Sequence, residues 1–213
     1  MSNVEFPPNW FDANYYQHGL ETGKSNYQNY RWIPELTIPL AMTIIDYLEI
    51  KRHHFILDLG CALGYLVKAF RLLHRQAWGA DVSDYALTNT DLSIRNYCFN
   101  SNSSEILKRR FDFCVAKDIF EHLSISTLKE TIHLLEYTKT IFAVIPLGKD
   151  GQYIAPTNNM DKSHVICEDM NWWRKTFSDL GLIVEEYRYQ INGIKDAYYK
   201  DYPEAHGFFV LTR

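Results

Sequence analysis

The stretch HFILDLGCALG, residues 54–64, holds three structural signals in an order that decides the fold. A short apolar run, FIL, is typical of a buried parallel strand, and Asp58 stands where that strand should end. A tight turn with Gly60 and Gly64 follows, and residues 65–73 then have helical spacing. Such a strand, turn and helix form a cradle, because glycine lets the backbone approach a ligand and the first amides of a helix favour polar or anionic groups.

The turn itself, DLGCALG, resembles the first motif of the class I S-adenosylmethionine (SAM)-dependent methyltransferases, usually an acid followed by x-Gly-x-Gly-x-Gly. Ala62 stands where the middle glycine is usual. We expect the turn to survive with Ala62 at a negative φ, because alanine is the smallest residue that adds a Cβ. Dinucleotide-binding folds have a G-x-G-x-x-G loop at a similar place. The spacing Gly60-x-x-x-Gly64 does not match that fingerprint.

A second acid strengthens the prediction of an adenosine ligand. The segment QAWGADV, residues 76–82, is predicted to be a strand ending in Asp81, which lies 23 residues after Asp58. This is about the interval between a glycine turn and the acid that binds ribose hydroxyls. One carboxylate can accept from both the 2′ and the 3′ hydroxyl. The alternative is that Asp81 caps the helix that begins near Ser83.

Composition bounds the class of protein. The chain has 213 residues, of which 46% are hydrophobic, and this predicts one domain with a full core. A net charge of −4 gives no indication of a nucleic-acid surface. The four cysteines have no C-x-x-C spacing, so we expect free thiols in a reducing compartment. We find no signal peptide and no apolar run of membrane-spanning length, and therefore expect a cytoplasmic protein without a membrane partner.

The remaining elements complete an α/β pattern. Helices are predicted at 34–50, 65–74, 83–92, 126–137 and 164–180, and strands near 95–99 and at 111–117, 140–146, 182–189 and 206–211, with a hairpin-like excursion at 196–204. This alternation resembles the class I methyltransferase plan over residues 34–213. The resemblance implies a Rossmann-like, seven-stranded, mostly parallel sheet in the order 3-2-1-4-5-7-6, with the last strand antiparallel and helices on both faces.

The fourth predicted strand leads into candidate catalytic residues. It continues into Asp118-Ile-Phe-Glu121-His122-Leu123, which resembles a motif of many small-molecule methyltransferases. We interpret His122 as a general base, because imidazole titrates near neutral pH. The alternative is a helix-start residue satisfied by the backbone. His164 ranks second, because a histidine before this helix often lines the acceptor pocket in the resembled family. It could instead be a helix cap.

The resemblance also implies a set of SAM-binding residues. They come from the glycine turn, the ends of the second and fourth strands, the exit loop of the third strand and the segment before the first helix. They are Asp58, Gly60, Cys61, Ala62, Gly64, Asp81, Val82, Ser101, Asn102, Lys117, Asp118, Tyr30 and Arg31, with Asn100 a further candidate for contact with adenine. No metal site is predicted, because the acids and histidines lack a recurring ligand spacing. A divalent ion that bridges Glu121 and the acceptor is an alternative that no spacing supports.

Residues 1–33 form a separate unit, an arm or a lid. Their aromatic residues follow no steady period, which is typical of an arm that packs onto a domain. The flexible segment 19–25 could close over a ligand, and Tyr30 and Arg31 could reach a carboxylate. Both interpretations can hold together. The polar insert 147–163 follows a strand at the ligand edge and is predicted to roof the substrate pocket.

Methyl transfer from SAM to an oxygen of a small polar acceptor is the leading functional prediction (EC 2.1.1.-). The segments YRW and SHVICEDMNWW are similar to a bacterial group placed among glycan-modifying methyltransferases, which points to a sugar, a sugar-derived metabolite or a glycan precursor. Alternatives are a SAM-binding protein without turnover, a methyltransferase acting on RNA or protein, and a nucleotide-binding oxidoreductase. The chain is expected to be a monomer or a homodimer.

Overall fold

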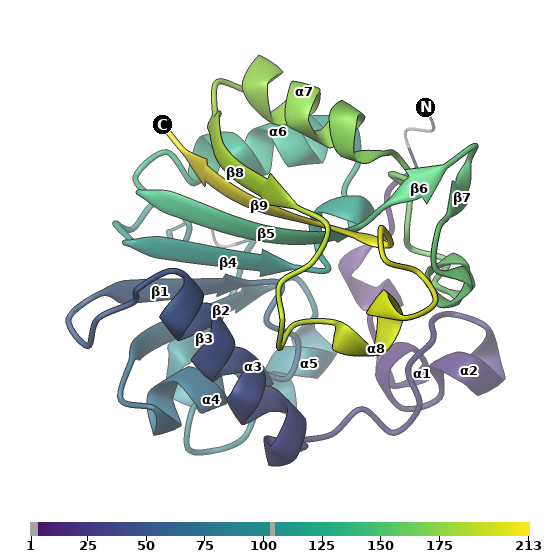
Figure 1. The fold of residues 1–213 in the computed structure, drawn as a ribbon. Coiled ribbons are helices and arrows are strands. Elements are labelled where there is room, and N and C mark those ends of the chain that lie inside the picture. The colour runs from purple at the N-terminus through teal and green to yellow at the C-terminus, as the bar shows by residue number, and fades with distance from the viewer. Residues whose placement is uncertain (1–3, 103–104) are drawn as a thin grey trace.

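A computed structural model describes residues 4–102 and 105–213, and its centre is a seven-stranded sheet (Figure 1). The strand order is β3-β2-β1-β4-β5-β9-β8. Among these strands, β9 alone runs against its neighbours, since it pairs antiparallel with both β5 and β8. The predicted topology is therefore confirmed. The strands are β1 Phe55–Leu59, β2 Gln76–Asp81, β3 Cys98–Asn100, β4 Phe113–Lys117, β5 Thr140–Pro146, β8 Ile183–Arg188 and β9 His206–Thr212.

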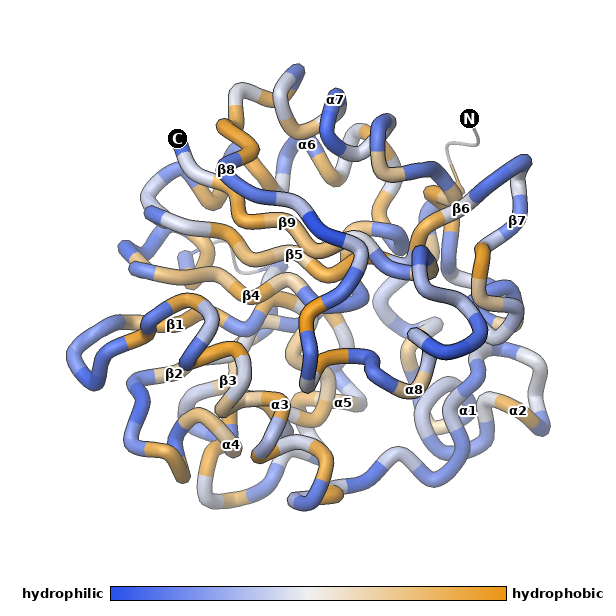
Figure 2. Tube along the Cα trace, in the orientation of Figure 1, coloured by the Kyte–Doolittle hydropathy of each residue, from blue (hydrophilic) through white to orange (hydrophobic). Residues whose placement is uncertain are grey.

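Helices cover both faces of the sheet, because successive strand residues point to opposite sides. On one face, α3 (Pro34–Tyr47) and α4 (Tyr65–Leu72) pack over residues such as Ile56 and Phe142. On the other, α6 (Ile125–Leu134) and α7 (Met170–Asp179) pack over neighbours such as Leu57. Figure 2 shows the strands β5 and β9 as largely hydrophobic, as expected for strands buried on both faces.

Several element boundaries differ from the sequence prediction. Helix α3 ends at Tyr47 rather than near 50, because Glu49 turns to a φ of 51°. Helix α5 covers only Asp84–Thr88, and a 3₁₀ turn at Arg95–Tyr97 takes the place of most of the predicted third strand. The excursion after residue 195 contains a short helix, α8 (Asp196–Tyr199), instead of a hairpin. Residues 103–104 of the predicted exit loop lie outside the described residues.

The insert after β5 is more ordered than a polar loop. It contains a small two-stranded sheet, β6 (Gly148–Lys149) with β7 (Gln152–Tyr153), and a 3₁₀ helix, η4 (Pro156–Met160). In Figure 1 this insert lies on the same side of the molecule as the N-terminal helices α1 and α2. The backbone amide of Lys162 donates to the carbonyl of Lys24, which joins the insert to the N-terminal segment.

The N-terminal segment packs its aromatic residues onto the sheet domain. It contains a 3₁₀ turn (Pro8–Trp10), α1 (Ala13–Tyr16) and α2 (Gly19–Thr22). The hydroxyl of Tyr15 donates to Asp161 Oδ2 at 2.7 Å, which joins two segments far apart in the sequence. Its buried rings form one aromatic cluster, which also includes Tyr65 and Tyr85 of the sheet domain.

Two further findings concern cysteines and membranes. All four cysteines are free, as predicted, and Cys61 and Cys114 are buried. Among the described residues, we find no helix with the length and apolar character needed to cross a bilayer.

Candidate functional site

A cavity of about 430 Å³ lies where the carboxyl ends of β1, β2 and β4 meet the N-terminal segment. Ligands of open α/β sheets bind at this edge, next to the point where the strand order reverses. Many of the residues predicted from the sequence line the cavity together, from four separate segments of the chain. These are Gly60, Ala62, Asp81, Val82, Ser101, Asn102, Asp118 and His122.

The glycine turn forms one wall of this cavity and depends on positive φ angles. Gly60 has a φ of 72°, and a Cβ at this position would lie 2.7 Å from Cδ1 of Ile119. Ala62 has a φ of 48°, so the expectation of a negative φ was wrong. The amide of Ala62 donates to Asp81 Oδ2 at 2.7 Å, and this bond holds the turn in a conformation that costs a non-glycine residue about 1–2 kcal/mol.

Asp81 lies at the end of β2 and is only 7% exposed. Its Oδ2 accepts from Ala62, and its Oδ1 accepts from the amide of Ser83 at 2.8 Å. Burial raises the pKa of Asp81, although these amides partly oppose the shift. The helix α5 is capped by the Ser83 hydroxyl, which accepts from Ala86, so the alternative role of Asp81 as the cap is wrong. Each carboxylate oxygen can accept a second hydrogen bond, which leaves acceptor capacity for a ligand.

A group of charged residues lies beside the cavity at the ends of β1 and β4. Asp118 has a φ of 54° and accepts from both Lys117 (2.5 Å) and Lys195 (2.7 Å). Burial alone would raise its pKa, but the two lysines hold the pKa of Asp118 well below its usual range. Asp58 is buried behind the glycine turn, and burial raises its pKa to about 8, while Lys117 acts in the opposite direction.

The structure places other predicted cofactor residues away from the cavity wall. Gly64 precedes α4, where a Cβ would lie 2.6 Å from Ile94, so its role is in packing. Cys61 is buried against the strand β2. Tyr30 stacks on Tyr65 within the aromatic cluster, and Arg31 is exposed to solvent.

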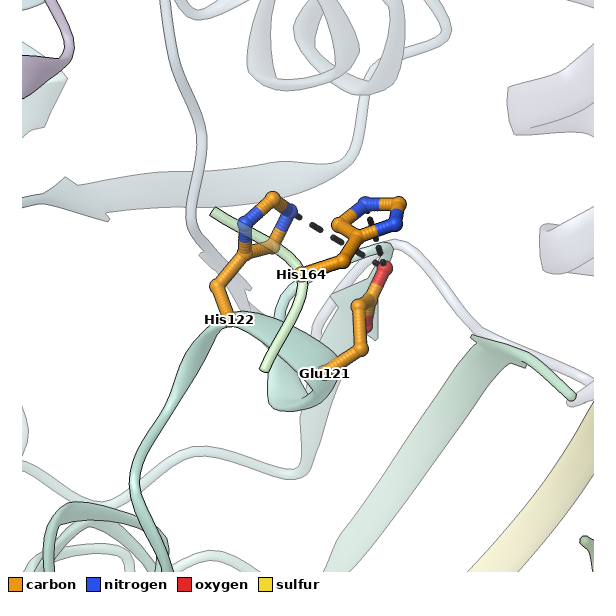
Figure 3. A group of neighbouring side chains, drawn as sticks. All are labelled: Glu121, His122 and His164. Carbon is orange, nitrogen blue, oxygen red and sulfur yellow. Dashed lines mark ion pairs between the residues drawn. The ribbon is translucent and has the colours of Figure 1, made fainter. Parts of the chain in front are cut away.

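His122 and His164 come together around a third residue, Glu121, as Figure 3 shows. Glu121 and His122 belong to a 3₁₀ turn, Phe120–His122, directly after β4. The carbonyl of Glu121 accepts from the amides of Val165 and Ile166 at 2.8 and 3.0 Å. These two bonds fix the segment after the insert against the turn. The imidazole rings of His122 and His164 therefore lie 4.6 Å apart, although the residues are distant in sequence.

Burial determines the charge of this group. Burial, together with the neighbouring His164, lowers the pKa of His122 to about 4, so the ring is neutral near pH 7. Burial likewise lowers the pKa of His164. Glu121 is fully buried, and its pKa is raised, first by burial and then by the charge of Asp118. His122 lines the cavity, whereas Glu121 and His164 lie behind it.

Sequence reasoning proposed an arm or a lid at residues 1–33, but it named Tyr30 and Arg31 rather than the residues of this segment that line the cavity. Phe11, Tyr15, Tyr16 and Tyr27 line it, and Glu5 accepts hydrogen bonds from Ser124 and Thr127 across it. The sequence contains an aromatic-rich segment but no periodicity that would show which rings face inward. The reach of Lys195 to Asp118 was also missed, because the pair depends on the path of the chain between β8 and β9.

No protein-family model matches the sequence, and a search of curated proteins finds no match either. Solved structures do match. A SAM-dependent methyltransferase from Archaeoglobus fulgidus is 13% identical with a TM-score of 0.62, over 84% of this chain and 97% of that chain. The fold is that of the class I SAM-dependent methyltransferases.

Two further structures share this fold. The methyltransferase domain of bacterial CtHen1 is 19% identical with a TM-score of 0.58, over 84% of this chain and 100% of that domain. The magnesium protoporphyrin IX methyltransferase of Synechocystis PCC 6803, whose structure contains SAM, is 10% identical with a TM-score of 0.62, over the whole of both chains. At these identities the similarity concerns the fold.

Proposed function

We propose that this chain is a SAM-dependent methyltransferase that methylates an oxygen of a small polar acceptor. The observation that carries the proposal is the convergence of Gly60, Asp81 and His122 on one cavity at the carboxyl edge of a sheet with this topology. A nucleotide-binding oxidoreductase is disfavoured, because the glycine spacing in the turn differs from the dinucleotide fingerprint.

The cofactor is proposed to lie across the ends of β1 and β2. Asp81 would accept from both ribose hydroxyls, and Ser101 and Asn102 would lie beside the adenine, next to Val82. The methionine part would pass over Gly60 towards Asp118, where no Cβ of the turn stands in the way. Lys117 acts from behind this wall through its charge, Asp58 lies buried behind the turn, and Gly64 and Cys61 shape the turn.

The reaction is an in-line displacement. The acceptor oxygen forms a bond to the methyl carbon as the carbon–sulfur bond breaks, and the electron pair returns to sulfur to give S-adenosylhomocysteine (SAH). The acceptor's proton leaves to Nε2 of His122, whose Nδ1 is bonded to Ser163. SAM is already activated by its sulfonium charge, so the protein mainly supplies alignment, which can lower a barrier by about 7 kcal/mol or more.

The acceptor would lie between His122 and the aromatic side chains of the N-terminal segment. Phe11 and Tyr15 close the cavity from this side, and Tyr15 is bonded to Asp161 of the insert. We propose that residues 1–33 act as a lid in this way. A sugar or a sugar-derived metabolite fits such a wall, which combines aromatic faces with hydroxyl and carboxylate groups. An RNA substrate is disfavoured by the net charge of −4.

Calorimetric titration tests the cofactor, and SAH formation tests the turnover. SAH is expected to bind with one site per chain, whereas NAD is expected to give no heat. With SAM and a panel of hydroxylated sugars, SAH should form. His122→Ala should lower kcat about 10²–10⁴-fold and leave SAH affinity unchanged. His133→Ala, in an exposed position on α6, is the matched control. Binding of NAD but not SAH would refute the proposal.

A further inference from the structure

Glu121, His122 and His164 present three potential ligand atoms to one point (Figure 3). Glu121 Oε1 lies 4.0 Å from Nε2 of His122 and 3.9 Å from Nε2 of His164, and the three ligand atoms all lie within 4.8 Å of one another. Two atoms bound to the same metal ion at about 2.0–2.2 Å lie up to about 4.4 Å apart. The side chains therefore need only a small inward movement to share an ion.

The carboxylate of Glu121 is buried without a hydrogen-bond partner among the described residues. The side chain is fully buried, and neither oxygen has a hydrogen-bond partner among the residues that the structure describes. Buried carboxylates are ordinarily paired, hydrogen-bonded or bound to a metal, because removal of a charge from water is costly. Lys117 and Lys195 lie nearby, but both direct their ammonium groups to Asp118.

The hydrogen bonds of the histidines fix which ring nitrogen carries the proton. Nδ1 of His164 lies 2.8 Å from the carbonyl oxygen of Asn158, which can only accept. His164 therefore carries its proton on Nδ1 and directs the lone pair of Nε2 towards Glu121. A partner of this kind on the second ring nitrogen is typical of histidines that bind metals.

His122 also carries its proton on Nδ1, because hydrogen bonds connect it through Ser163 to Asp161. The Ser163 hydroxyl donates to Asp161 Oδ1 at 2.6 Å, so its oxygen accepts from Nδ1 of His122 at 2.9 Å. Nε2 of His122 thus also presents a lone pair. Three acceptors face one another, and Glu121 Oε1 lies about 4 Å from each imidazole nitrogen. A single proton on Glu121 cannot bridge these gaps, because they exceed hydrogen-bond length. A cation between the three atoms would satisfy all of them.

We propose that Glu121, His122 and His164 bind a first-row transition-metal dication, with an open coordination position directed to the cavity. Two imidazoles and one carboxylate suit Zn²⁺, Mn²⁺ or Fe²⁺ better than Mg²⁺ or Ca²⁺, which prefer all-oxygen sites. His122 lines the cavity, so an ion bound at its Nε2 lies at the edge of the acceptor site.

This site deepens the proposed function, because it gives the acceptor oxygen a binding partner. At its open coordination position the ion would bind an acceptor hydroxyl and lower the pKa of that hydroxyl, as metal ions do for bound water. The hydroxyl proton would then pass to solvent, since Nε2 of His122 is occupied by the ion. This part of the inference rests on the proposed methyl transfer, whereas binding of the ion does not.

Metal content tests the site without the need for an acceptor. The purified chain is treated with a chelator, incubated with Zn²⁺ or Mn²⁺, passed through a desalting column and analysed for bound metal. We expect one ion per wild-type chain and per His133→Ala chain. Glu121→Gln and His164→Ala should lose the ion, with affinity reduced at least about 100-fold in calorimetry with the same ions.

Two controls keep the result decisive. Glu121→Gln preserves the shape of the side chain and removes its charge, so it should fold even if His164→Ala does not. Circular dichroism and SAH binding by the metal-free protein report folding and the cofactor site separately. The inference is overturned if the wild type retains no ion, or if folded Glu121→Gln retains as much metal as the wild type. If the wild-type chain retains the metal but does not bind SAH, the methyltransferase proposal alone is contradicted.

Discussion

Replacement of Asp81 by asparagine separates ligand recognition from folding at the proposed ribose site. The side chain is nearly isosteric, but one of its two acceptor oxygens becomes an amide donor. In the wild type each oxygen already accepts one backbone amide, from Ala62 or Ser83. The new amide group must therefore face one of these N–H groups, and the remaining oxygen can serve only one ribose hydroxyl without charge assistance.

The expected magnitude follows from these hydrogen bonds. A hydrogen bond to a charged group contributes about 1.5–3 kcal/mol. Loss of one such bond to ribose and weakening of the other amounts to roughly 3 kcal/mol, or on the order of 100-fold in Kd. Stability should change little, because burial raises the pKa of Asp81 and asparagine removes the cost of a buried charge while losing one amide bond. We expect the free energy of unfolding to stay within about 1 kcal/mol of the wild type.

Calorimetry with SAH measures the affinity, and urea denaturation measures the stability. Asp46→Asn makes the same change of charge at an exposed position of α3 and should bind SAH like the wild type. If Asp81→Asn binds SAH within about threefold of the wild type, the carboxylate does not hold the ribose, and the proposed orientation of the cofactor is wrong.

Three other substitutions test the wall of the cavity and the core. Gly60→Ala should weaken SAH binding and destabilise the fold by about 1–2 kcal/mol, measured by calorimetry and urea denaturation, because the residue has a φ of 72° and its Cβ would meet Ile119. Tyr15→Phe removes the bond to Asp161, so limited proteolysis should cut the N-terminal segment faster, at a cost of about 1.5–3 kcal/mol in unfolding free energy. An unchanged cleavage rate would contradict this. Trp173→Ala empties a fully buried position and should lower the unfolding free energy by about 3–5 kcal/mol in the same denaturation assay.

The sheet, and the edge of the sheet at which the cavity lies, were predictable because each depends on local sequence patterns. Apolar runs predicted the strands. The acids that follow two of these runs, Asp58 and Asp81, predicted the edge at which the cavity forms. The conformation of Ala62 was not predictable, because its positive φ depends on a hydrogen bond to a residue in the next strand. Intrinsic preference argued for a negative φ, and a tertiary contact overrode it.

The grouping of Glu121, His122 and His164 could not be read from the sequence for a related reason. Metal motifs are recognised by regular spacing, whereas here two of the proposed ligands are adjacent and the third follows a long insert. Two backbone hydrogen bonds to the carbonyl of Glu121 bring the third ligand into place. The position of the aromatic wall from the N-terminal segment could not be predicted either, because it depends on contacts between residues far apart in the sequence, such as that between Tyr15 and Asp161.

The most direct test of the whole account is a crystal structure of the chain with SAH. The account predicts both ribose hydroxyls within hydrogen-bond distance of the Asp81 carboxylate, with the sulfur facing the side of the cavity that His122 lines. SAH bound elsewhere, or lying in this cavity with its ribose turned away from Asp81, would contradict the account.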